Sequence, residues 1–382
     1  MKQENENTIR VALIARSTLY RVPGGDTVQM MQTAAALNRE GIRAEIRLTN
    51  EPIDYNKYDL FHFFNVTRPA DILHHVKSSG KQYIISPIYI DYSLYDKYFR
   101  KGISGLLFKY LSSDACEYLK AIMRKIKGND SLNSFSYLWK GQKASVKEIL
   151  KKASMVLPNS SSEYKRLKNS YDASFQHFVV PNGIDPELFA LKNDVERDND
   201  LVLCVGRIEG VKNQLNLIRA LNNTRYKLLL IGYPAPNQLG YYEECKRIAA
   251  GNVQFIDYLP QHELPCYYQR AGIHILPSFF ETTGLTSLEA AAMGCKVIVT
   301  DKGDTVEYFG DLAGYCEPGS PESIFQTVEL VHAQSYDNRL REKILSEYTW
   351  ANASVSILRA YQQVIKANES FEWNPGYSLS TQ

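Results

Sequence analysis

Short apolar segments alternate with helical segments along most of this chain, and the alternation starts again near residue 200. The first series consists of RVALIA (10–15), IRAEIRL (42–48), YDLFHFF (58–64), QYIISP (82–87) and SMVLP (154–158). The second consists of DLVLCVG (200–206), KLLLIG (227–232), NVQFID (252–257), IHILP (273–277), KVIVT (296–300) and AGYCEP (313–318). Strands that alternate with helices are typical of doubly wound parallel sheets. The restart predicts two α/β domains, which suits a length of 382 residues.

The segment ETTGLTSLEAAAM at 281–293 is the most informative part of the second series. Between two apolar strands it opens a short helix on small and hydroxyl residues, namely Thr282, Thr283, Gly284, Thr286 and Ser287. A helix N-terminus after such a loop presents free N–H groups and a positive dipole end to an anion. Glu281 and Glu289 frame this helix start, and carboxylates beside an anion site suit sugar hydroxyls. Gly294 is expected to end the helix.

The pattern around these glutamates resembles the signature of retaining glycosyltransferases of family 4, which have the GT-B fold. A plain βα unit with two surface glutamates is the alternative for the spacing alone. Pro277-Ser278 before the pair and the strand behind it strengthen the resemblance, which extends to PNGID (181–185) and GRIEGVKN (206–213). One departure concerns sugar contacts: Thr282-Thr283 stand where the family usually has Gly-Phe.

The resemblance implies a cleft between two Rossmann-like domains. The N-terminal acceptor domain is expected at 1–180 and the nucleotide-sugar domain at 181–350. A helix within 351–382 would cross back to the first domain, followed by a mobile tail.

The resemblance also implies roles for residues of the second domain. Arg207 and Lys212 would hold the donor diphosphate, since two fixed cations stabilise it as it leaves. Glu281 would bind sugar hydroxyls and stabilise an oxocarbenium-like transition state. Further donor contacts are expected at Gly25 of the first domain and at Gly206, Thr283, Gly284, Leu285, Thr286 and Glu289 of the second, the last to ribose hydroxyls. No D-x-D motif suggests a metal, and no cofactor is expected.

The first domain departs further from the family. Many relatives have a histidine after the strand that is QYIISP here, but this chain continues with IYIDYS. Tyr89, Asp91 and Asp26 are therefore candidate acceptor contacts. His62 fits a core histidine better than a site residue. Glu307 matches a position often acidic in relatives, although a surface glutamate is an equal alternative.

Charge is concentrated in one part of the first domain. Thirteen Lys and Arg residues but four Asp and Glu residues lie between 97 and 152, interleaved with aromatic and aliphatic residues. A solvated helical insertion with an apolar core face is one interpretation. A surface that rests on anionic lipid is the other. Nothing in the chain resembles a nucleic-acid module.

The expected protein is cytoplasmic, with peripheral association with the inner face of the membrane as a further hypothesis. Six cysteines without C-x-x-C spacing indicate reduced thiols. The polar N-terminus and the lack of a long apolar stretch predict neither signal peptide nor membrane span.

The predicted function is transfer of a hexose-type sugar, from a UDP-sugar in preference to a GDP-sugar, to a carbohydrate or lipid-linked oligosaccharide of a surface polysaccharide. A phosphorylase or synthase of the same fold, or a non-catalytic scaffold, is the alternative. No G-x-G-x-x-G follows any predicted strand, which disfavours a nicotinamide dehydrogenase.

Overall fold

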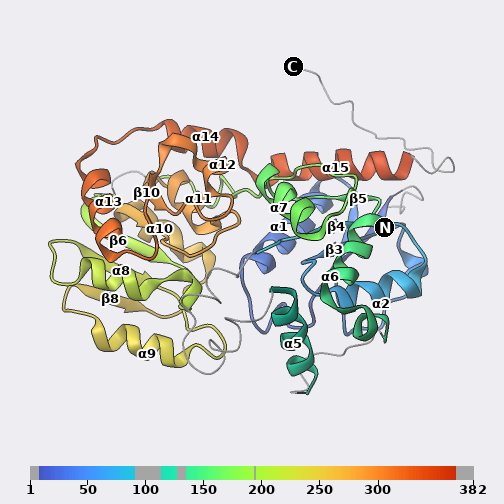
Figure 1. Cartoon of the computed structure of the whole chain (residues 1–382). Helices are drawn as coiled ribbons and strands as arrows, with labels where there is room; N and C mark the ends of the chain where they lie inside the picture. The colour runs from blue at the N-terminus through green and yellow to red at the C-terminus, as the bar shows by residue number, and fades with distance from the viewer. Residues whose placement is uncertain (1–7, 91–112, 127–134, 193–194, 367–382) are drawn as a thin grey trace.

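The computed structural model describes residues 8–90, 113–126, 135–192 and 195–366. These residues form two lobes that lie side by side (Figure 1), each built on one parallel sheet with helices packed against it. The expectation of two doubly wound α/β sheets is confirmed.

The first sheet has the order β2-β1-β3-β4-β5, and all its strand pairs are parallel. Its strands are β1 (Arg10–Ala15), β2 (Arg43–Leu48), β3 (Leu60–Phe64), β4 (Tyr83–Ser86) and β5 (Met155–Val156). The helices of this lobe are α1 (Gly25–Arg39), α2 (Pro69–Ser79), α5 (Ser113–Ile126), α6 (Phe135–Lys152) and α7 (Ser161–Tyr171), with the 3₁₀ turn η1 (Tyr55–Lys57). β3 and β4 are buried along their whole length, which explains why all their residues except His62 and Ser86 are apolar.

The second sheet has the order β11-β10-β9-β6-β7-β8 and is also parallel. Its strands are β6 (Asp198–Val205), β7 (Lys227–Ile231), β8 (Val253–Ile256), β9 (Ala271–Ile275), β10 (Lys296–Val299) and β11 (Gly314–Tyr315). The strand order reverses between β6 and β9, and ligands of such sheets bind outside the carboxyl ends of the strands at this point.

Helices and 3₁₀ turns complete the second lobe. They are η2 (Gly210–Lys212), α8 (Gln214–Leu221), α9 (Leu239–Ile248), η3 (Gln261–Glu263), α10 (Leu264–Arg270), α11 (Leu285–Ala292), α12 (Thr305–Phe309), η4 (Gly310–Leu312), α13 (Pro321–Ala333) and α14 (Arg339–Glu347). The predicted helix end is found at α11, where Gly294 has φ +78° just after the last turn.

The last helix, α15 (Trp350–Lys366), lies along the first lobe in Figure 1. Trp350, Ile357 and Tyr361 are buried in the core that β1 and α1 build. The Tyr361 hydroxyl is hydrogen-bonded to Nδ1 of His62 at 2.8 Å, and Ser86 Oγ to Nε2 at 2.9 Å. Complete burial lowers the pKa of His62 to about 3, so this histidine is a neutral core residue.

The chain passes between the lobes twice, and the two connections are in backbone contact. Ile184 N donates to Tyr348 O at 2.9 Å, and Trp350 N donates to Ile184 O at 3.1 Å. A Cβ atom at Gly183 would lie 2.3 Å from the carbonyl carbon of Thr349. Only glycine therefore allows the two connections to approach this closely.

The predicted insertion at 97–152 is helical where the structure describes it, in α5 and α6. α6 contains a kink at Gly141, with φ +75°. Within the described ranges, no helix combines the length and the apolar character that crossing a bilayer requires.

Candidate active site

The carboxyl edges of the two sheets meet at the contact between the lobes. The turn after β1 lies against the second lobe, because Tyr233 donates a hydrogen bond to Pro23 O at 3.0 Å. A Cβ at Gly24 would lie 3.7 Å from the guanidinium carbon of Arg207, and one at Gly25 would lie 3.8 Å from Leu285 Cδ1. The structure thus brings Gly25, a predicted donor contact of the first domain, next to Leu285, and the adjacent Gly24 next to Arg207.

Glu281 and Lys212, 69 residues apart in sequence, form an ion pair at the centre of this edge. Lys212 Nζ lies 2.5 Å from Glu281 Oε1, and Ser278 Oγ donates to the same oxygen at 2.5 Å. The side chain of Glu281 is 6% exposed and that of Lys212 is 22% exposed. A nearly buried carboxylate is therefore oriented by two donors while its ammonium partner still reaches solvent.

The backbone of Glu281 is fixed by the segment after β10. Glu281 N donates to Lys302 O, and Asp304 N donates to Glu281 O, both at 2.9 Å. Gly303 has φ +119°, and a Cβ there would lie 1.9 Å from Glu281 O. Gly303 is thus required for this contact, which sequence reasoning missed because it joins two loops.

Arg207 follows β6 and faces the turn of the first lobe. Its Nη2 lies 3.0 Å from Glu209 Oε1, and Gln214 Nε2 donates to its carbonyl oxygen at 2.9 Å. Its side chain is 30% exposed, and Gly206 before it has φ +153°. Arg207 and Lys212 both lie in the segment between β6 and α8, so two cations face the contact between the lobes.

Gly284, with φ +69°, is the N-cap residue that precedes α11. The first N–H groups of an α-helix have no partner within the helix. The side chain of Thr283 is occupied elsewhere, because it accepts from Asn182 Nδ2 at 3.0 Å and donates to the Tyr308 hydroxyl at 3.3 Å. Thr286 on the first turn is partly exposed.

Ser287, also on the first turn of α11, is a further candidate that the sequence analysis did not assign a role. Its hydroxyl is buried and has no hydrogen-bond partner among the described residues. A Cβ at Gly284 would lie 3.6 Å from Ser287 Oγ, so this unsatisfied group is at the helix start.

Glu289 is buried in α11 and is already hydrogen-bonded. It accepts from Gln261 Nε2 at 2.7 Å and from the Tyr268 hydroxyl at 2.9 Å. Burial raises the pKa of Glu289 to about 7, against the opposing effect of these two bonds. Gln261 and Tyr268 are partners of Glu289 that sequence reasoning did not find.

The candidate acceptor residues make contacts within the first lobe. Arg16 holds Asp26 through two bonds, Nε to Oδ2 at 2.6 Å and Nη2 to Oδ1 at 3.0 Å. Burial tends to raise the pKa of Asp26, but hydrogen bonding and charge from Arg16 give a net lowering. Tyr89 donates through its hydroxyl to Ser170 Oγ at 3.2 Å. Asp91 lies outside the described residues, and acceptor binding by all three remains a prediction.

Carboxylates at the start of α12 in the second lobe accept hydrogen bonds from α7 in the first lobe. Glu307 accepts from Ser161 N at 2.7 Å and from Ser162 N at 3.0 Å, at the positive end of α7. Arg166 binds both carboxylate oxygens of Asp304. Glu307, which the sequence left open as a surface residue, is thus an interlobe contact.

The second lobe is similar to proteins that are already known. Residues 188–346 match the family described as Glycosyl transferases group 1. D-inositol 3-phosphate glycosyltransferase of Frankia alni is 26% identical over 247 residues, which cover 57% of this chain and 61% of that protein. O-antigen chain mannosyltransferase B of Escherichia coli is 25% identical over 171 residues, 42% of this chain and 45% of that protein. The chain thus spans less than two thirds of the length of these curated relatives.

Solved structures resemble both lobes together. Sucrose-phosphate synthase of Thermosynechococcus elongatus has a TM-score of 0.74 at 17% identity, covering 94% of this chain and all of that one. HepE of Anabaena, solved in complex with UDP and glucose, has a TM-score of 0.60 at 14% identity, covering 95% of this chain and all of that one. With parallel sheets of five and six strands, the chain has the GT-B fold that its sequence suggests.

Proposed function

We propose that the protein is a retaining, metal-independent glycosyltransferase, because residues 188–346 match the glycosyl transferases group 1 family and the chain has the GT-B fold. It transfers a hexose-type sugar from a nucleotide-diphosphate donor to a carbohydrate or lipid-linked acceptor. The observation that carries this proposal is the pair of Lys212 Nζ and Glu281 Oε1 at 2.5 Å, beside Arg207 and the N-terminus of α11.

In the proposed mechanism, the donor diphosphate is the leaving group. Arg207 and Lys212 offset its growing negative charge, and the N–H groups of Gly284 and Leu285 add hydrogen bonds. Glu281 binds sugar hydroxyls and stabilises positive charge at the anomeric carbon. As the bond from that carbon to the phosphate oxygen breaks, the leaving oxygen takes the proton of the acceptor hydroxyl. The new glycosidic bond then forms on the same face, which retains the configuration.

A UDP-sugar is the favoured donor. HepE was solved with UDP and glucose, which supports this choice, while the relation to a mannosyltransferase keeps a GDP-sugar open. The same relative acts in O-antigen chain synthesis by name, which supports a role in surface polysaccharide synthesis. Product analysis with sugar phosphates and inorganic phosphate as acceptors separates this function from a phosphorylase or synthase.

Calorimetry with UDP and GDP tests the donor site. We expect Arg207→Ala to weaken binding of the preferred diphosphate at least about tenfold, because a charge-assisted bond to a phosphate is lost. The affinity for the matching nucleoside should stay the same. Unchanged diphosphate affinity would rule out this role of Arg207. Activity should persist in EDTA, and activity lost in EDTA and restored by Mg²⁺ or Mn²⁺ would contradict metal independence.

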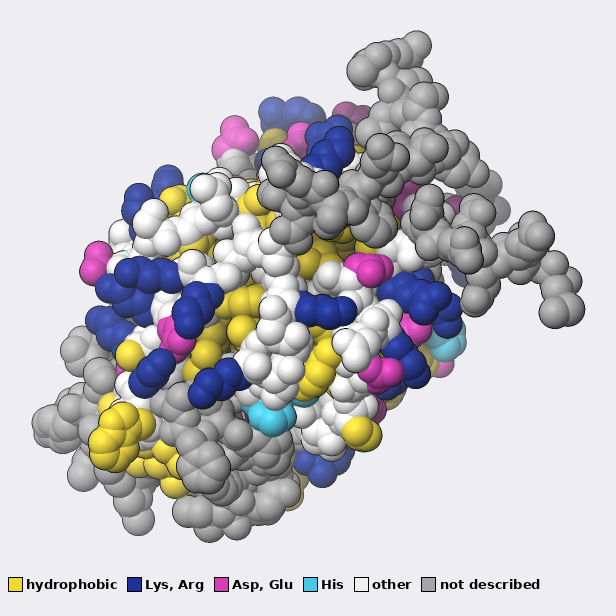
Figure 2. All heavy atoms as spheres, turned by 90° about the vertical axis from the view of Figure 1, so that its right-hand side faces the viewer, with side chains coloured by type: hydrophobic (Ala, Val, Ile, Leu, Met, Phe, Trp, Pro, Cys, Tyr) yellow, Lys and Arg dark blue, Asp and Glu magenta, His cyan; other side chains and the backbone are white. Residues whose placement is uncertain are grey.

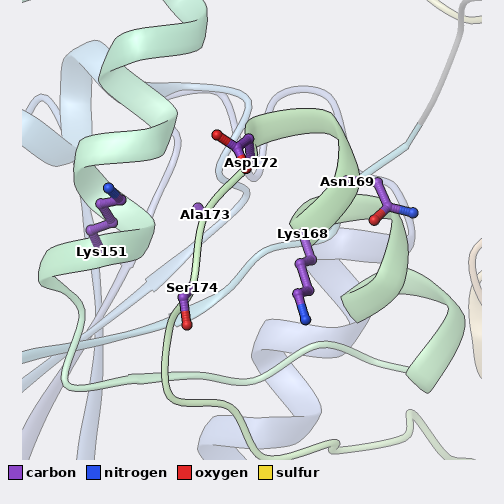
Figure 3. A pocket seen from close by; sticks show the side chains of 6 residues that line it. All are labelled: Lys151, Lys168, Asn169, Asp172, Ala173 and Ser174. Atoms are coloured by element: carbon purple, nitrogen blue, oxygen red, sulfur yellow. The ribbon is translucent and has the colours of Figure 1, made fainter.

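We also propose that the first lobe associates with an anionic membrane surface. On α6, Trp139 is 94% exposed, and Lys143 and Lys151 lie on the exposed face. Figure 2 shows Lys and Arg side chains gathered on one side of this end of the molecule, above an apolar patch. Lys151 of α6 and Lys168 of α7 line one pocket, together with Asn169, Asp172, Ala173 and Ser174 (Figure 3). Basic groups beside an exposed aromatic ring suit anionic headgroups.

Vesicle cosedimentation tests this association. Wild-type protein should bind vesicles that contain anionic lipid at low salt, and binding should weaken as salt rises. Combined Lys143→Glu and Lys151→Glu replacement should reduce binding, since each basic group near the surface contributes about 1 kcal/mol. The charge-rich segment 97–152 also has basic residues at 124, 125 and 127, and replacing them with glutamate is a further test, although their side chains lie outside what the structure describes. If the wild type does not bind these vesicles even at low salt, membrane association is wrong and α6 is a solvated helix.

A further inference from the structure

An exposed tyrosine extends the row of side chains along the carboxyl edge of the second sheet. Arg207, Tyr233 and Tyr258 each stand two residues after the end of a strand, β6, β7 and β8 respectively. These three strands are parallel neighbours. Adjacent strands lie about 5 Å apart, so the three residues follow one another along this edge. Tyr258 is 62% exposed, which leaves a large apolar ring in contact with solvent.

Contacts connect Tyr258 to both ends of the proposed nucleotide site. Its ring meets the edge of Tyr233, with centroids 5.7 Å apart and an interplanar angle of 67°. Tyr233 is close enough to Arg207 for the guanidinium charge to act on its hydroxyl. Three residues after Tyr258, Gln261 Nε2 donates to Glu289 Oε1 at 2.7 Å. The loop of Tyr258 thus connects the diphosphate-binding side of the edge to the carboxylate proposed for ribose.

A nucleoside diphosphate has its parts in a fixed order of diphosphate, ribose and base. With the diphosphate at Arg207 and the ribose at Glu289, the base must lie within reach of the loop between β8 and α10. We propose that Tyr258 is the platform on which the base of the donor nucleotide stacks, an inference that rests on the proposed function. Every base has a π-face, so an aromatic platform contributes affinity without reading one base by hydrogen bonds.

Two neighbouring side chains are the rivals for this role. His262 is in the same loop, and its side chain is 73% exposed. Tyr233 could instead transmit an effect of Tyr258, because its hydroxyl bonds to Pro23 O of the other lobe. Both rivals can be tested separately, by His262→Ala and by Tyr233→Phe, which removes that hydroxyl but keeps the ring that Tyr258 contacts.

The test is calorimetry with UDP, GDP and inorganic pyrophosphate on the full chain. Tyr258→Ala should weaken binding of the nucleoside diphosphate that the wild type prefers by about tenfold or more, because a base loses its stacking partner. Tyr258→Phe should bind it within about twofold of the wild type, since the ring remains. Pyrophosphate has no base, so its affinity should not change in either variant.

Tyr336→Ala is the matched control. Tyr336 is also an exposed tyrosine of the second lobe, at 51%. It lies at the opposite edge of the sheet, because a Cβ at Gly294, two residues before β10, would lie 3.1 Å from its hydroxyl oxygen. This variant should bind UDP, GDP and pyrophosphate as the wild type does.

The remaining outcomes show which part of the proposal is wrong. A wild type that binds neither UDP nor GDP overturns the proposed function and this inference with it. A wild type that binds, together with an unchanged Tyr258→Ala variant, overturns the platform alone. Equal losses for the nucleotide and for pyrophosphate in Tyr258→Ala, or a matching loss in Tyr233→Phe, show that Tyr258 acts through the lobe contact and also overturn it. A loss in His262→Ala alone assigns the platform to His262.

Discussion

Glu281 is the residue whose replacement should separate binding from chemistry most clearly. Glu281→Gln keeps the size of the side chain and an oxygen for Ser278, but removes the charge that would stabilise the transition state. We expect kcat to fall about 100-fold or more, while the donor dissociation constant changes by less than about threefold. Steady-state kinetics and calorimetry on the same preparation check both numbers. Glu148→Gln, which breaks surface ion pairs on α6, is the control. Near-normal turnover in Glu281→Gln would contradict the assignment.

Burial of Glu163 should make the stability of the fold depend on pH. It is fully buried and accepts from Tyr89 N and Asn159 N at 2.5 Å each, yet burial raises its pKa to about 7. A carboxyl group with a raised folded-state pKa stabilises the fold below its unfolded pKa, about 4.5, and loses this contribution as pH rises toward 7.

The comparison of wild type with Glu163→Gln isolates that contribution. The advantage of the wild type in unfolding free energy should shrink between pH 5 and pH 8, by about 3 kcal/mol at most. Glu289 titrates in the same range but is present in both proteins, so it cancels from the difference. Denaturant unfolding at the two pH values measures the change. If the advantage of the wild type grows with pH instead, the two backbone hydrogen bonds lower the pKa of Glu163 by more than burial raises it.

At the scale of single elements, α12 is the contact that opening of the lobes must break. Glu307→Gln removes the charge at the N-terminus of α7 but keeps an oxygen for one N–H group. We expect a loss of about 0.5–1 kcal/mol at this partly exposed contact. Amide hydrogen exchange at Ser161 and Ser162 should become about two- to fivefold faster. Exchange at Ser323 N, which the cap of α13 protects within the second lobe, is the internal control. Unchanged exchange at α7 would show that Glu307 does not hold the lobes together.

The elements themselves could be predicted from the sequence far better than their contacts. The apolar run at 10–15 is β1 as predicted, and the cap glycine after α11 ends its helix. Both signals are local. A run of apolar residues indicates β1, and a glycine that can adopt a positive φ angle indicates the end of α11. The contact of Gly303 with Glu281, and the bond of Gln261 to Glu289, join loops that only the fold brings together. The sequence likewise indicates Asp26 as a candidate residue. It does not predict the hydrogen bond from Arg16 to Asp26, because that contact depends on how the turn after β1 folds.

At the scale of the whole molecule, the paired connections at Gly183 and Thr349 decide how the lobes are joined. Gly183→Ala would force a Cβ to within 2.3 Å of the Thr349 backbone, so the two connections must separate. We expect a loss of about 1–3 kcal/mol in unfolding free energy. Gly240→Ala in α9 is the matched control, because nothing lies within 4 Å of a Cβ there. That helical position should gain up to about 1 kcal/mol. Thermal unfolding that ranks Gly183→Ala at or above the wild type would contradict this account.

The return of α15 to the first lobe sets the order in which the protein can be completed during synthesis. Domains generally fold as units while the chain emerges, N-terminal part first. Here the first sheet is made early, but Trp350, Ile357 and Tyr361 of its core come from α15. His62 can therefore form its hydrogen bond with Tyr361 only after a further 299 residues have been synthesised. A ribosome that has finished both sheets still carries an open first core, so a chain that stops before α15 should be a substrate for chaperones and proteases.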